Sequence, residues 1–260
     1  MERLIGNVQI ISWKDTDIKL LHKELEIPNW APWLAASLET MKTRASVFPA
    51  GQLVLTENTQ PKVSLSTNRI NWNGNIDHLP SWDEVAGDMP NYKTTYQPKG
   101  NTLVLMSMNV APMEQGKGYA RKMLEEAKLL AVKLGIQNLI GSFRPSEYGK
   151  HKQHMLGNHG TPLSFEQYVY SKRDDGLPVD SWLRNLTRNG VELWKVDDSA
   201  MTVTVSFDEF MGYIPQEQQL WYVTDNTIVT DQVGDWRVDY GSQTVTYQEK
   251  NIWGGLPFHI

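Results

Sequence analysis

The residues Gln115-Gly116-Lys117-Gly118-Tyr119-Ala120 have the types and the spacing of a loop that binds an anion. Gly116 and Gly118 carry no side chain, so a ligand can approach the backbone N–H groups of the loop closely. Where such a loop opens a helix, the first N–H groups have no partner within the helix, and the helix dipole adds positive potential. A diphosphate group suits this arrangement, and Lys117 would add a charge contact. Two glycines alone can also mark an ordinary tight turn.

Two regular elements flank the loop and would position it. Residues 102–110 are almost continuously apolar, which favours a strand, and Pro112 ends it because proline has no N–H for a ladder. From Tyr119 onward, apolar residues recur at helical spacing with charged residues opposite, until Gly135 supplies a stop signal. The pattern predicts a strand, a glycine loop and a helix in direct succession.

Two other phosphate-binding loops are excluded by their spacing. A dinucleotide fingerprint requires Gly or Ala where Arg121 stands, and an acidic residue near the end of the next strand, where Ser142 stands. A Walker loop requires Ser or Thr after its lysine, whereas Gly118 follows Lys117. The sequence therefore supports neither of these sites.

The pattern Val110-x-Pro112-x-x-Gln115-x-x-Gly118-x-Ala120 resembles the acyl-coenzyme A signature of the GNAT acetyltransferase superfamily. The apolar strand, the helix and a further strand at 136–143 occur in the order of that family. The resemblance implies a mixed α/β fold with a central mixed β-sheet flanked by helices, and acetyl-CoA as the co-substrate. It implies that the backbone of Met108, Asn109 and Val110 pairs with the pantetheine arm. The diphosphate would be held by Gln115, Gly116, Lys117, Gly118, Tyr119 and Ala120.

The resemblance also implies direct attack of an amine on the thioester, and the absence of cysteine is consistent with this. A carboxylate or an ordered water would deprotonate the amine. Glu84 and Asp83 are the candidates, on a segment at 73–100 that is too long for a hairpin loop. We interpret this segment as a lid beside the acceptor site, with Trp82 on it; the alternative is an Ω-like loop that only covers the surface. Backbone N–H groups after Met108 would meet the oxyanion.

The leaving thiolate needs a proton donor, for which the family commonly uses a tyrosine on the helix after the fifth strand. The helix before Gly190 contains no tyrosine. Tyr148, Tyr168 and Tyr170 remain as candidates, with Tyr148 preferred for its position after a strand, although each of them can equally be a packing residue. Arg144 would bind an anionic group of the coenzyme or the acceptor, or else be a salt-bridged loop arginine.

Composition excludes several other classes of function. The net charge is −5, from 30 acidic and 25 basic residues without a Lys/Arg block, which does not favour a nucleic-acid partner. No run of eighteen apolar residues and no apolar leader is present, so we expect a cytoplasmic protein without a membrane partner. Without cysteine, and with no carboxylate at metal spacing from His151, His154 and His159, no metal is expected. The sequence is compatible with a homodimer.

The remaining chain predicts further elements around this motif. We expect strands at 5–13, 52–57, 62–72, 191–196 and 201–207, and helices at 15–25, 30–45, 164–173 and 178–189. Beyond 212 the sequence reads as all-β, with strands at 220–224 and 227–230 and a hairpin at 236–249 that turns at Gly241-Ser242 and sets Val238 across from Val245. We expect a GNAT-like domain at 1–212, with its coenzyme motif at 103–135, and a C-terminal β-rich extension at 213–260 packed on it.

Three functions are compatible with these observations. The leading one is an acetyl-CoA-dependent N-acetyltransferase that acts on the amine of a small molecule. Within the same fold, a protein or peptide N-acetyltransferase or a longer-chain acyltransferase is the alternative. A non-catalytic acyl-CoA-binding module is the third. A small closed pocket under the segment from Trp72 to Trp82 would favour a small amine, and an open groove would favour a peptide.

Overall fold

The computed structural model of the chain describes residues 8–87, 92–214 and 220–258. It has a mixed α/β fold, as predicted, in two compact units. Unit 1 runs from the N-terminus to residue 80 and includes 84–141 and the C-terminal residues from Leu256; unit 2 comprises 81–83 and 142–255. In this division, residues 142–212 belong to the same unit as most of the C-terminal segment. The boundary predicted after residue 212 remains a prediction about the extent of the GNAT-like domain.

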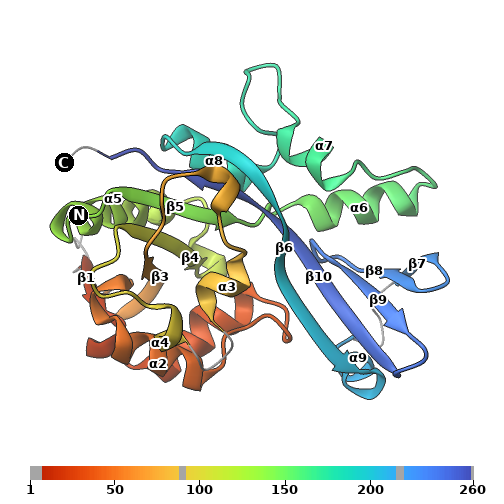
Figure 1. Cartoon of the computed structure of the whole chain (residues 1–260), viewed down its shortest axis with the longest axis horizontal. Coiled ribbons are helices and arrows are strands. Elements are labelled where there is room, and N and C mark those ends of the chain that lie inside the picture. Colours follow the sequence, from red (N-terminus) through yellow and green to blue (C-terminus); the bar gives the residue numbers. More distant parts are fainter. Residues whose placement is uncertain (1–7, 88–91, 215–219, 259–260) are drawn as a thin grey trace, which may run out of the picture. The chain divides into compact units, whose positions relative to one another are not determined.

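The sheet of unit 1 is antiparallel except at its last pair. Its strands lie side by side in chain order, and only β4 and β5 run parallel (Figure 1). Parallel pairing requires a crossover, which α5 supplies. The strands are β1 (Val8–Ser12), β2 (Gln52–Glu57), β3 (Gln60–Ile70), β4 (Thr102–Val110) and β5 (Asn138–Phe143). Residues 5–7 of the predicted first strand lie outside the described part.

The β2–β3 hairpin turns more tightly than predicted. Glu57 pairs with Gln60, and both intervening residues, Asn58 and Thr59, have positive φ (51° and 67°). This is the conformation of a two-residue type I′ turn, whose twist matches that of the strands. The predicted start of the second strand at 62 is therefore wrong, because β3 begins at Gln60.

The structure describes five α-helices that lie wholly or partly in unit 1, together with short 3-10 turns. They are α1 (Ile18–Leu21), α2 (Leu38–Val47), α3 (Trp82–Ala86), α4 (Tyr92–Thr95) and α5 (Tyr119–Lys133). The helix predicted at 15–25 begins later, with Asp17 as its cap, and changes to a π-type turn at His22–Glu26. The helix predicted at 30–45 begins only at Leu38, because the Ser37 hydroxyl caps it and the Ala36 N–H is bound by Glu26. A buried cluster includes Trp13, Leu21, Leu25, Met41 and Val54.

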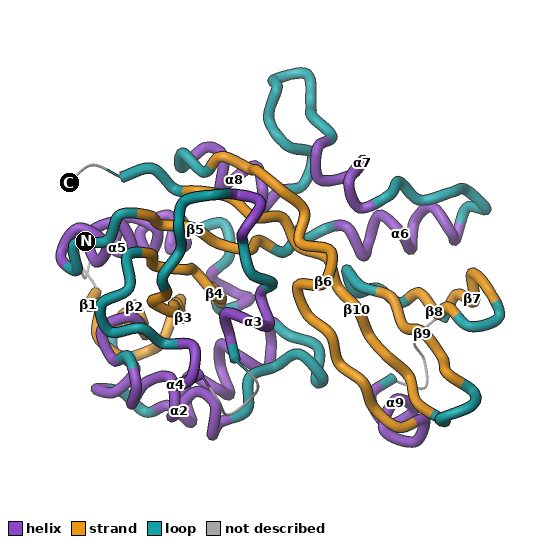
Figure 2. The backbone as a smooth tube through the Cα atoms, in the orientation of Figure 1, coloured by secondary structure: helices purple, strands orange, loops and turns teal. Residues whose placement is uncertain are grey.

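Unit 2 is built on a second set of antiparallel strands. In Figure 1, β6 and β10 are two long neighbouring strands, and β9, β8 and β7 follow beside β10. The strands are β6 (Glu192–Ser206), β7 (Trp221–Thr224), β8 (Thr227–Val229), β9 (Asp235–Asp239) and β10 (Thr244–Gly255). The helices, purple in Figure 2, are α6 (Tyr148–Gly157), α7 (Phe165–Tyr170), α8 (Ser181–Arg188) and α9 (Phe207–Tyr213).

Two predictions for unit 2 are corrected by the strand pairing. The strands predicted at 191–196 and 201–207 are one strand, β6, whose interruption is a bulge opposite Glu249 and Asn251. The predicted register of the last hairpin is confirmed, since Val238 lies across from Val245. The connection between β9 and β10 is longer, however, than the predicted turn at Gly241-Ser242. In this loop Asp239 accepts hydrogen bonds from the N–H groups of Gly241 and Ser242.

Candidate functional site

The strand β4 loses one of its two neighbours before it ends. Its register with β5 stops where Leu105 lies beside Gly141, while its register with β3 continues to Val110. Among the described residues, the last part of β4 therefore has no strand on its β5 side. This part contains Met108, Asn109 and Val110, for which sequence analysis predicted pairing with an extended ligand. An extended chain with amide groups can add to such an edge.

The helix α5 begins directly after the glycine loop. Gly118 is its N-terminal cap, in the left-handed conformation with φ 85°, and no side chain caps the helix there. The first bond of the helix runs from Lys122 N–H to Gly118 C=O. The N–H groups of Gly118 to Arg121 precede this bond, so they have no acceptor within the helix.

The loop leaves space for a ligand. Gly116 also has positive φ, 78°, and a Cβ built on either glycine meets no protein atom within 4 Å. The four residues Gln115 to Gly118 are exposed. The loop thus presents backbone N–H groups at the positive end of a fifteen-residue helix, in the order that the sequence predicted.

Charged side chains lie around the loop. Glu114 accepts from Lys117 Nζ at 2.8 Å and from Lys62 Nζ at 2.7 Å. The Tyr119 hydroxyl lies 3.2 Å from Glu57 Oε2. Lys117, predicted to contact the diphosphate, is therefore already ion-paired in this structure.

No protein-family model and no curated protein matches the chain. Solved structures do. The loading GNATL domain of CurA from Lyngbya majuscula matches with a TM-score of 0.64 at 16% sequence identity, over 96% of this chain and 97% of that one. The GphF GNAT-like decarboxylase, solved in complex with isobutyryl-CoA, matches with a TM-score of 0.57 at 22% identity, over 74% and 90%. The chain has the GNAT fold. The resemblance read from the loop is thus confirmed for the fold.

In this GNAT fold the candidate tyrosines lie in unit 2, within a packed cluster. The Tyr148 hydroxyl donates to Leu163 C=O at 3.0 Å, and the Tyr148 ring packs against Phe165 and Tyr168. The Tyr168 hydroxyl lies 3.4 Å from Asp180 Oδ2. Burial, above all, raises the pKa of both tyrosines, so both stay protonated. Tyr170 is half exposed, and its hydroxyl donates to Trp194 C=O.

The segment at 73–100 is folded wherever it is described, and residues 88–91 lie outside the described part. It contains the short helices α3 and α4 (Figure 2). Within unit 2, Asp197 accepts the N–H of Trp82 at 3.0 Å, and Asp83 accepts the N–H of Thr202 at 2.8 Å. Glu84 is exposed and belongs to unit 1. The carboxylate of Asp83 is thus used by the backbone, and the roles predicted for these three residues remain predictions.

A hollow of about 470 Å³ lies at the start of this segment in unit 1. It is open to solvent and is lined by Asn71, Trp72, Asn73 and His78. Asn73 and His78 bond to each other at 2.9 Å across their side chains.

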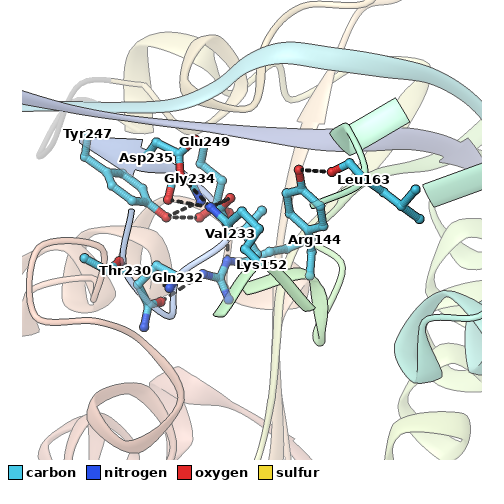
Figure 3. A network of polar contacts seen from close by, with 11 residues as sticks. Arg144, Lys152, Leu163, Thr230, Gln232, Val233, Gly234, Asp235, Tyr247 and Glu249 are labelled. Atoms are coloured by element: carbon cyan, nitrogen blue, oxygen red, sulfur yellow. Dashed lines mark hydrogen bonds and ion pairs between the residues drawn. The ribbon is translucent and has the colours of Figure 1, made fainter. Parts of the chain in front are cut away.

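Arg144 takes part in a buried network (Figure 3). Its Nε donates to Glu249 at 2.7 Å, and another of its nitrogens donates to Gln232 at 3.0 Å. The Glu249 side chain is fully buried and also accepts from the Tyr247 hydroxyl. In the same view, Lys152 donates to the carbonyls of Val233 and Gly234 and to Asp235. The geometry favours the salt-bridge alternative for Arg144 over an anionic ligand.

Sequence analysis also missed buried carboxylates, among them Glu26 and Asp197. Glu26 accepts from Asn109 Nδ2 at 2.6 Å, and Asn109 accepts from the indole of Trp30, so the side chain of a β4 residue fixes the segment before α2. Asp197, in unit 2, also accepts from the Ser142 hydroxyl at 3.2 Å. Burial raises the pKa of both carboxyl groups. No local sequence signal marks them, because their side-chain partners Asn109 and Ser142 lie more than fifty residues away.

Two features are absent from the part of the chain that the structure describes. No group of three or more His, Asp or Glu side chains there could hold a metal ion. No helix there has the length and apolar character needed to cross a membrane.

Proposed function

We propose that the protein binds an acyl-coenzyme A and acts on its acyl group. The observation that carries the proposal is Gly118, a left-handed cap that leaves the N–H groups of α5 open, in the loop that follows a strand which has lost its neighbour. A diphosphate and an extended amide arm joined in one ligand fit these two features in this order. The GNAT fold supports the same ligand.

The chain's own groups would bind and orient this ligand. The N–H groups of Gly118 to Arg121 would hold the diphosphate, and β4 beyond Leu105 would pair with the pantetheine arm. The coenzyme supplies a thioester, which activates the acyl group. The open space before Gly116 and Gly118 is consistent with this placement.

For the reaction, we propose acetyl transfer to the amine of a small molecule. The amine would attack the thioester carbonyl and the coenzyme thiol would leave, so no residue of the chain needs to be acylated. Glu84, which is exposed, would accept the proton of the amine. A peptide acceptor and a longer acyl chain are variants of the same transfer.

A second candidate reaction is decarboxylation of a carboxyacyl-coenzyme A. It is favoured by the match to GphF, which is described as a GNAT-like decarboxylase. In this reaction a carbon–carbon bond breaks, carbon dioxide leaves and a proton replaces it, while the thioester stays intact. A binding module without turnover is the third candidate.

One experiment separates these candidates. The purified protein is incubated with acetyl-CoA and a panel of amines and peptides, and separately with malonyl-CoA and methylmalonyl-CoA. Free thiol is measured, and the coenzyme products are weighed by mass spectrometry. Acetyl transfer gives thiol that depends on an acceptor, whereas decarboxylation gives a lighter thioester and no thiol. Unchanged thioesters in every mixture would leave only the binding module.

A further inference from the structure

Three charged side chains from different elements meet at the glycine loop. Lys62 comes from β3, Glu114 from the 3-10 turn Pro112–Glu114, and Lys117 from the loop itself. Glu114 binds Lys62 through Oε1 at 2.7 Å and Lys117 through Oε2 at 2.8 Å. The side chains of Lys62 and Glu114 are 16% and 17% exposed, whereas that of Lys117 is 56% exposed.

This arrangement changes what Lys117 can contribute to ligand binding. The ammonium group of Lys117 already pairs with a carboxylate. When it moves to a phosphate, the net gain in binding free energy is only the difference between its interaction with the phosphate and its interaction with Glu114. The two lysines hold the pKa of Glu114 below its usual range, so Glu114 is ionised at neutral pH and competes at full charge. The affinity of the loop for an anion therefore depends on Glu114 as well as on the glycines.

The two lysines differ in their freedom to leave Glu114. Lys117 is the more exposed, and its flexible stem can turn outward at little cost in packing. Lys62 is largely covered, so it stays on Glu114. Because Lys62 remains, Glu114 keeps a partner when Lys117 departs.

We propose that Glu114 is a built-in counter-ion of the coenzyme site, which retains Lys117 until a phosphate of the coenzyme displaces it. Lys62 anchors Glu114 throughout the exchange. This inference rests on the proposed function, since it takes the loop to be the site of the coenzyme diphosphate. Glu114 thereby lowers the affinity for the coenzyme and favours its release after turnover.

The test is a calorimetric titration of the whole 260-residue chain with coenzyme A at low salt. Glu114→Gln should bind about three- to fivefold more tightly than the wild type, the equivalent of one exposed ion pair removed from the competition. The matched control is Glu125→Gln, which removes the carboxylate of the exposed pair Arg121–Glu125 further along α5, at 3.1 Å. It makes the same change in net charge and should alter the affinity far less.

The gain in affinity for coenzyme A must also depend on Lys117. In a Lys117→Met background, adding Glu114→Gln should improve the affinity for coenzyme A only as much as Glu125→Gln improves that of the wild type. The reason is that the Lys117 ammonium group, which Glu114 retains, is then absent. Unchanged or weaker binding by Glu114→Gln, or a gain that persists in full without Lys117, would overturn the inference while leaving coenzyme binding intact. A folded wild-type protein that does not bind coenzyme A would overturn the proposed function as well, and the two failures are thus distinguishable.

Discussion

At the residue scale, the ion pair of Arg144 and Glu249 stabilises unit 2 by satisfying a charge that has no access to water. Glu249 is fully buried, and its partners are Arg144 and Tyr247. Removing one member of such a pair leaves the other charge buried and unpaired, which costs more than the pair itself contributes. The desolvated arginine is therefore a structural element of the network in Figure 3.

Arg144→Met should lower the free energy of unfolding by roughly 3 to 5 kcal/mol, because Glu249 loses its ionic partner. The double variant Arg144→Met, Glu249→Gln should recover much of this loss. Urea unfolding followed by tryptophan fluorescence measures both. If Arg144 instead serves an anionic ligand, Arg144→Met would unfold at the wild-type midpoint and lose affinity for coenzyme or acceptor.

Tyr148 is a second residue for which removal of the hydroxyl group distinguishes a structural role from a catalytic one. Tyr148→Phe removes the bond to Leu163 and should cost about 1 kcal/mol of stability. The control Tyr170→Phe removes a bond at an exposed position, from the hydroxyl to Trp194, and should cost less. The catalytic role predicted for Tyr148 requires in addition that kcat falls more than KM, since a proton donor to the thiolate acts in the transition state. Normal kinetics in a less stable Tyr148→Phe protein would leave it as a packing residue.

At the element scale, His151 and Tyr148 together hold the connection between α6 and α7. His151 Nε2 accepts the N–H of Leu163 at 3.2 Å, and Tyr148 binds the carbonyl of the same residue. A ring nitrogen can accept only while the imidazole is neutral. Burial, and then the neighbouring His154, lower the pKa of His151 below its usual 6.5.

This geometry predicts a pH dependence whose sign is fixed. A histidine whose pKa is lower in the folded state contributes stability above the unfolded pKa, and the contribution is lost as pH falls from 6.5 through the folded value. The wild-type melting temperature should therefore fall between about pH 7.5 and about pH 5.5 more than that of His151→Gln, whose amide oxygen accepts at either pH. His159→Asn, an exposed control, should keep the wild-type slope. Equal slopes in all three proteins would remove His151 from this role.

Elements with strong local signals were predictable from the sequence. The strand at 102–110 and the helix that starts at Tyr119 match because an apolar run, a proline and a glycine define them locally. The helix α9 was missed although Ser206 and Glu209 form a capping box that the sequence displays. The bulge that joins the two halves of β6 depends on pairing with β10, which no local pattern contains.

The same distinction holds for the site. The glycine loop was readable because its chemistry lies in six consecutive residues. Lys62 was not, since it reaches Glu114 only through the register of β3 with β4, fifty-two residues along the chain. Asp197 escaped for the same reason, because its partners Ser142 and Trp82 are distant in sequence.

At the scale of the whole molecule, the chain combines a unit that contains the glycine loop with a second unit built on β6 and β10. The predicted extension at 213–260 is joined to earlier residues by the register of β10 with β6. Residues 81–83 belong to unit 2 although their neighbours in sequence belong to unit 1, because Asp197 and Thr202 bind them. Sequence order alone therefore does not define these units.

The central claim, that the N-terminus of α5 binds an acyl-coenzyme A, is tested most directly by calorimetric titration of acetyl-CoA into two alanine variants of the same helix. Gly118 and Gly135 flank α5 at its two ends, both have positive φ, and a Cβ on either meets open space. Both variants should therefore lose a similar stability, about 1 to 2 kcal/mol. Gly135→Ala should bind acetyl-CoA like the wild type. Gly118→Ala should bind at least about tenfold more weakly, because its methyl group would enter the open space that the diphosphate is proposed to occupy. Equal affinity in the two variants, or no binding by the wild type, would contradict the claim.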